Sequence, residues 1–157
     1  MHPQEVLTTL SDYPHSVARR AGETLTARTS GLYRASYRAG QADIPASSLS
    51  LIAALPGGGH NSRTVRVGPD GRVYVSLGIS GNCSDQYLGA DYPFAEWRGG
   101  VLVLRETGSK AALESFACGL RNPVGVAIGP DGALYLSSDS GINALFRLAL
   151  NPESASH

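Results

Sequence analysis

The chain has 157 residues, which is enough for one sizeable hydrophobic core, and this length favours a single domain. Its 13 basic and 13 acidic side chains cancel, with neither a basic stripe for nucleic acid nor an acidic run typical of a disordered tail. No stretch is long and apolar enough to span a bilayer. We therefore expect neither nucleic acid nor a membrane among the partners of this protein.

The predicted elements are short strands, because 19 glycines and 9 prolines are a high content of turn-forming residues. Residues 1–12 are expected to form an N-terminal extension, and they show neither the basic nor the apolar region of a secretory signal. A first strand–turn–strand unit follows, with strands at Pro14–Ala18 and Thr24–Ala27. Two further strands are expected at Gly31–Tyr37 and Leu49–Leu55.

An internal repeat defines the middle of the chain. The segment Val65–Ser76 recurs as Val126–Ser137, 61 residues further on. In each copy Gly-Pro-Asp-Gly lies between apolar or alternating strands, and this tetrapeptide suits a type I turn with proline at its second position. Additional strands are expected at Gly100–Arg105 and Ala144–Leu150.

The repeat predicts an all-β fold, a partial β-propeller of about three four-stranded blades in one domain over residues 1–157. The long spacing between the copies is assigned to a loop insertion at residues 79–98, and residues 151–157 to a flexible tail. Because propellers close with roughly 4–8 blades, the chain is either part of a larger ring or completes a ring by self-association. A free-standing three-sheet solenoid is the remaining alternative.

Two polar clusters precede the repeat copies at equivalent points. In Gly57–Thr64, three glycines allow close approach of the backbone to a ligand, and His60 is either a general base or a surface or capping residue. In Gly119–Gly125, Arg121 and Asn122 offer donors and an amide to a planar anionic ligand. An inter-blade salt bridge is the alternative role of Arg121.

The insertion forms a third cluster. Its aromatic and acidic residues either line a sugar pocket, with Asp85 or Asp91 meeting a cation, or belong to an ordered surface loop. The segment around Ser80 lacks the final glycine of a nucleophile elbow. Cys83 and Cys118 form either one disulfide bridge or two buried thiols, and sequence alone leaves both open.

Taken together, these motifs resemble the glucose/sorbosone dehydrogenase family. The family shows the same order of three motifs, at Gly57–Thr64, Gly68–Ser76 and Gly119–Gly125. The stretches Ser80–Asp85 and Arg98–Leu104 resemble the sorbosone branch in particular. The resemblance runs from about Tyr13 to Asp139, which is most of this chain but only the middle of a family member.

The resemblance implies a roughly six-bladed propeller that holds pyrroloquinoline quinone (PQQ) beside Ca²⁺ and oxidises a sugar aldehyde or hydroxyl by hydride transfer to the quinone. By position, His60 corresponds to the general base of the family, and Arg121, Asn122 and Arg63 to residues that contact the cofactor.

The resemblance places the calcium site near Ser140 and Gly141. The chain also departs from the family. Val124 stands where the glucose branch has glutamine, and the lysine and further arginines of the later blades are missing. Family members are usually exported, whereas no signal is recognisable here. The compartment therefore stays open, and the isolated chain is expected to be inactive or to need self-assembly.

Two other function classes compete with this sugar dehydrogenase-like oxidoreductase. One is a metal-dependent sugar lactonase-type propeller, which requires several converging carboxylate ligands. The other is a non-catalytic propeller fragment that acts as a carbohydrate-binding or assembly module, an alternative favoured by the small number of blades.

Overall fold

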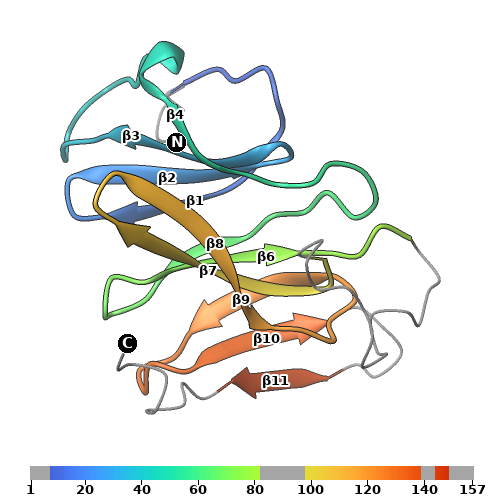
Figure 1. Ribbon diagram of the computed structural model, residues 1–157. Helices are drawn as coiled ribbons and strands as arrows, with labels where there is room; N and C mark the ends of the chain where they lie inside the picture. The colour runs from blue at the N-terminus through green and yellow to red at the C-terminus, as the bar shows by residue number, and fades with distance from the viewer. Residues whose placement is uncertain (1–7, 82–97, 139–143, 149–157) are drawn as a thin grey trace, which may run out of the picture.

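The structure is a computed structural model that describes residues 8–81, 98–138 and 144–148. Over these residues it is all-β, with three stacked antiparallel sheets and one short 3₁₀ turn, η1 (Ala46–Ser48) (Figure 1). No helix in this described part is long and apolar enough to cross a membrane. The predicted all-β, propeller-type architecture is confirmed.

Each sheet is built from strands that are consecutive in the chain. The first sheet has the order β1 (Pro14–Arg20), β2 (Glu23–Arg28), β3 (Gly31–Ser36), β4 (Ser50–Ala54). The second has the order β5 (Val65–Val67), β6 (Val73–Leu77), β7 (Gly100–Thr107), β8 (Lys110–Ala117). The third contains the described strands β9 (Pro123–Ile128), β10 (Leu134–Ser138), β11 (Leu145–Leu148).

The repeated Gly-Pro-Asp-Gly segments form the same turn twice. The amide of Gly71 donates to the carbonyl of Gly68, and that of Gly132 to Gly129, each at 2.9 Å. Gly71 and Gly132 have φ of 79° and 76°, a left-handed conformation that a residue with a side chain rarely adopts. The turns therefore join β5 to β6 and β9 to β10 as predicted.

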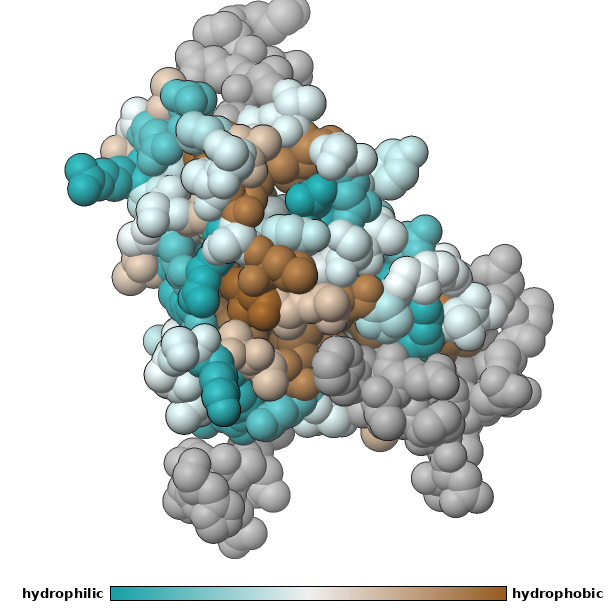
Figure 2. Space-filling model, turned by 45° about the horizontal axis from the view of Figure 1, so that its top comes forward, coloured by the Kyte–Doolittle hydropathy of each residue, from teal (hydrophilic) through white to brown (hydrophobic). Residues whose placement is uncertain are grey.

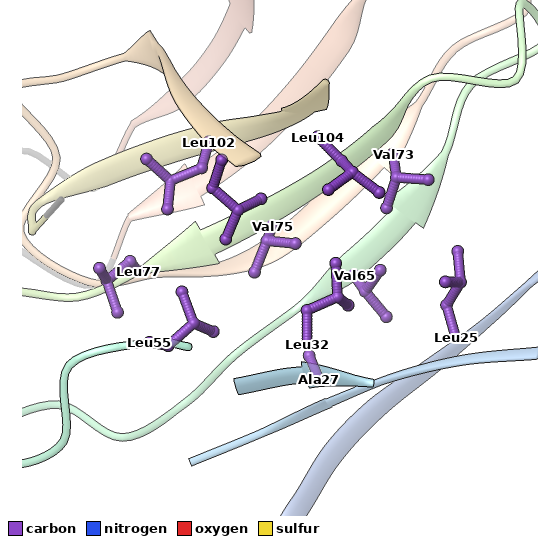
Figure 3. Close-up of a cluster of buried hydrophobic side chains, with 11 residues drawn as sticks. Leu25, Ala27, Leu32, Leu55, Val65, Val73, Val75, Leu77, Leu102 and Leu104 are labelled. Atoms are coloured by element: carbon purple, nitrogen blue, oxygen red, sulfur yellow. The ribbon is translucent and has the colours of Figure 1, made fainter. Parts of the chain in front are cut away.

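The middle sheet is buried on both faces, and its side chains alternate between two cores. One core lies between the first and second sheets and contains Val73, Val75 and Leu77 from β6 (Figure 3). Tyr74, between them in sequence, points to the opposite face and packs with Leu134 in the core shared with the third sheet. Because successive side chains of a strand point to opposite faces, one strand serves both cores.

The sheets are stacked through their first strands. β5 lies against both β1 and β9. The amide of Val65 donates to the Ser16 hydroxyl at 2.6 Å, and the Thr64 hydroxyl donates to the carbonyl of Val124 at 2.6 Å. Equivalent strands of neighbouring sheets thus meet, as expected for neighbouring propeller blades.

Strand β8 was not predicted from the sequence. It begins at Lys110, which pairs with Thr107 of β7 across a tight turn at Gly108, φ 61°. The strand is rich in alanine, glutamate and serine, which have low strand propensity, and several of its residues are exposed. Its cross-strand pairing with β7 overrides that local preference.

Candidate functional site

Three loops meet at one end of the second sheet. They are the segment before β5, which carries His60, the residues that follow β6, and the segment before β9, which carries Arg121. The amide of His60 donates to the carbonyl of Ile79 at 3.1 Å, and the amide of Ile79 donates to the carbonyl of Arg121 at 2.9 Å. The residues after β6 therefore join the two polar clusters that the sequence singled out.

Gly78 lies between the two predicted site residues. A Cβ atom added to it would lie 2.6 Å from His60 Cβ and 2.7 Å from Asn122 Oδ1. His60 Cβ and Asn122 Oδ1 therefore lie close together, at most the sum of these two distances apart. Only a residue without a side chain lets the histidine and the amide approach this closely.

His60 and Asn122 each leave one buried polar atom unpaired. His60 is half-buried, and Asn122 is only 7% exposed. Neither His60 Nε2 nor Asn122 Oδ1 has a hydrogen-bond partner among the described residues. Because buried polar atoms are nearly always hydrogen-bonded, these two atoms are available to a ligand that carries polar groups.

Arg63 organises the loop that carries His60. It is 1% exposed and donates from Nη1 to the carbonyls of His60 (2.6 Å) and Ser62 (3.0 Å), and from Nη2 to that of Pro56 (3.0 Å). Burial, together with the charge of nearby Arg98, lowers its pKa to about 10, so the guanidinium stays charged at neutral pH. All these contacts are with its own loop, so Arg63 supports a ligand through the shape of the loop.

Arg98 is a site residue that sequence reasoning missed. It is 6% exposed and donates from Nη1 to the carbonyl of Gly58 at 3.1 Å and from Nη2 to the carbonyl of Gly57. The sequence held no signal for this contact, because 40 residues separate Arg98 from Gly58. Only the pairing of β6 with β7 brings them together.

Arg121, Ser140 and Gly141 are the remaining predicted site residues. Arg121 is half-buried and lies in the loop before β9, and its contact with a cofactor stays a prediction. Ser140 and Gly141, the predicted calcium residues, lie outside the described residues. Among those that are described, no three His, Cys, Asp or Glu side chains form a group that could hold a metal ion.

The insertion lies almost entirely outside the described residues, including Cys83, Asp85 and Asp91. Cys118 is an exposed free thiol, so the expectation that it is buried is wrong. It occupies the link between β8 and β9, where no core packs over it. The partner in the alternative of a bridge, Cys83, is one of the residues that the structure does not describe.

No protein-family model and no curated protein matches this sequence. Similar solved structures do exist. A Trichoderma reesei enzyme of Carbohydrate-Active Enzymes Family AA12 is similar in its iodide structure (15% identity, TM-score 0.76) and its calcium structure (17% identity, TM-score 0.74). Each alignment covers 95% of this chain and 43% of that one.

A third similar structure is the holo form of the PQQ domain of pyranose dehydrogenase from Coprinopsis cinerea. It is 14% identical, with a TM-score of 0.69, and the alignment covers 94% of this chain and 40% of that chain. At such identities the similarity shows the fold alone. The chain has the fold of these carbohydrate-active and PQQ domains and spans less than half of their length.

Proposed function

We propose that this chain is part of a PQQ-dependent sugar dehydrogenase, of the glucose/sorbosone type, that oxidises a sugar aldehyde or hydroxyl. The observation that carries the proposal is the pair of unpaired polar atoms, His60 Nε2 and Asn122 Oδ1, on either side of Gly78. The fold shared with a PQQ domain supports the same assignment. Because the chain spans under half of that domain, we assign the activity to a self-associated form of this chain and expect the monomer to be inactive.

His60 is suited to act as the general base. Its Nε2 has no protein partner in the described part of the chain, so the atom is available to accept the proton of a sugar hydroxyl. Its main chain is held from two sides, since its amide donates to Ile79 and its carbonyl accepts from Arg63. A fixed backbone limits the positions that the imidazole can take, which favours an oriented proton transfer.

Asn122 and Arg121 are the residues that we assign to the quinone. Asn122 presents a buried carboxamide beside His60, and Arg121 adds a positive charge suited to carboxylate or carbonyl oxygens. When bound, PQQ supplies the two-electron acceptor for the hydride of the sugar. The protein residues bind and orient the reactants and take up the proton. For Ca²⁺, we keep Ser140 and Gly141 as the proposed site.

Self-association is part of the proposal. On the outer face of the first sheet, Tyr13 is 79% and Val17 is 62% exposed. A pocket of about 270 Å³ lies there, lined by Leu10, Val17 and Ile44 among others. Figure 2, in which this end of the molecule comes forward, shows apolar residues gathered in patches between polar ones. Such patches favour cover by a blade of a second copy of this chain.

A reconstitution experiment tests the dehydrogenase proposal. The purified chain is incubated with PQQ and Ca²⁺, passed through gel filtration, and assayed for dye reduction with glucose or sorbosone. We expect quinone absorbance to remain with the protein in the wild type, in His60→Ala and in the control His15→Ala, an exposed histidine bonded to Thr29. Dye reduction should be lost in His60→Ala alone.

The same experiment separates the alternatives. If the wild type retains no quinone, the dehydrogenase proposal is wrong, and the non-catalytic carbohydrate-binding or assembly module becomes the better description. Elution volume reports the size of the particle, and a monomer that nevertheless turns over would overturn the proposed self-association. The lactonase alternative has no ligand set among the described residues and predicts lactone hydrolysis without quinone.

A further inference from the structure

Arg98 is placed where it can control the loop that carries His60. It lies just before β7, in a different element from the loop, and is almost completely buried. Its two terminal nitrogens donate to the carbonyls of consecutive residues, Gly57 and Gly58. Among the described residues, these two carbonyls are the acceptors seen for its guanidinium, and no carboxylate pairs with it.

The loop needs such an anchor because of its own sequence. Gly58 and Gly59 have φ of 79° and 65°, so the chain turns sharply here with few side chains to hold it. A Cβ on Gly59 would lie only 2.4 Å from Ser80 Cα, so this glycine is pressed against the segment after β6. His60 follows directly, and its position depends on how this turn is held.

Two guanidinium groups hold the turn. Arg63 binds the carbonyls of Pro56 and His60 from within the loop, while Arg98, just before β7, binds the carbonyls of two residues between them. Each has the planar donor fork that can satisfy two acceptors at once. The two groups are close enough for the charge of Arg98 to lower the pKa of Arg63. Two like charges are buried together, and each binds its own carbonyl groups of the same loop.

The geometry points to Arg98 as a positioning residue for His60, which it fixes through the carbonyls of Gly57 and Gly58. This inference rests on the proposed role of His60 as the base. Both terminal nitrogens of Arg98 are bonded to carbonyls of the loop, so Arg98 acts on the reaction through the loop. Its loss is therefore expected to lower the rate of proton transfer more than the affinity for the quinone.

The test compares Arg98→Met and Arg98→Lys with the control Arg105→Met. Arg105 lies on β7 itself, is half-buried, and pairs with Glu114, away from the loop. In the reconstituted protein we expect kcat for dye reduction to fall at least about ten-fold in Arg98→Met, with KM and quinone retention changed less than about three-fold. Arg98→Lys should regain part of the rate, because a lysine can bind one of the two carbonyls.

A second measurement does not depend on the cofactor. The His60 imidazole signal is assigned by NMR through its absence in His60→Ala and is then followed in the variants without quinone. We expect it to shift or broaden in Arg98→Met and to stay unchanged in Arg105→Met. An unchanged signal in Arg98→Met would overturn the inference, even if the wild type retains no quinone and the dehydrogenase proposal has failed. If Arg98→Met does not fold, Arg98→Lys decides: wild-type kcat together with an unchanged signal overturns the inference.

Discussion

Gly78 lies where a single added methyl group should disturb the candidate site most. In Gly78→Ala the new Cβ would lie 2.6 Å from His60 Cβ and 2.7 Å from Asn122 Oδ1. Comfortable contacts between carbon atoms are about 3.5–4.0 Å, so the neighbours must move by about 1 Å. Gly78 is not among the glycines with positive φ, so the effect is steric rather than conformational.

The magnitude follows from this overlap. Overpacking of a buried site costs about 1–3 kcal/mol, which lowers Tm by roughly 2–4 °C per kcal/mol in a chain of this size. A displacement of about 1 Å at a reacting group costs on the order of 100-fold in rate. We therefore expect Gly78→Ala to lose dye reduction by about 100-fold in the reconstituted protein, with a moderate fall in Tm.

Gly81→Ala is the matched control. It lies three residues further on, a Cβ there has no heavy atom within 4 Å, and its φ is not positive. Alanine at a compatible glycine position stabilises by about 0.4–1 kcal/mol through the unfolded chain. In Gly81→Ala, Tm should thus rise by at most about 4 °C, and dye reduction should match the wild type. If Gly78→Ala behaves like Gly81→Ala in both assays, the close approach of His60 and Asn122 around Gly78 is refuted.

Two further predictions concern stability. Burial alone would raise the pKa of the Glu106 carboxyl, but hydrogen bonds from Arg20 and Arg34 and their charges bring it below its ordinary value of 4.5. The ionised Glu106 therefore contributes its full stabilisation above about pH 4.5, and this stabilisation is lost as pH falls through the lower pKa of the folded state. Thermal unfolding measured at decreasing pH should show a smaller loss of stability in Glu106→Gln than in the wild type. An equal loss in the two proteins would contradict this. The Leu102 side chain is fully buried in the core between the first two sheets. Leu102→Ala should lower the free energy of unfolding, measured with urea, by about 2–5 kcal/mol. A loss below about 1 kcal/mol would show that this core is not tightly packed.

Most of the fold was predictable because it is encoded by local patterns. The two Gly-Pro-Asp-Gly turns need only the preferences of proline and glycine, and the apolar residues on either side of them identify the strands. Strand β8 was missed because its residues have weak strand propensity. β8 forms because β7 offers it a free edge for pairing, and a local sequence pattern does not show that such an edge is available.

The candidate site was likewise predictable only in part. The sequence by itself determined the kinds of groups available, an imidazole in a glycine-rich loop and an amide beside an arginine in the equivalent loop of the next unit. Only the tertiary structure decided that these groups approach each other around Gly78 and that Arg98 hydrogen-bonds to the loop of His60. Arg98 is 40 positions from Gly58, and Asn122 is farther still from His60, so the geometry of these contacts depends on how the sheets pair and stack. That geometry is a property of the assembled backbone, which short-range sequence preferences do not specify.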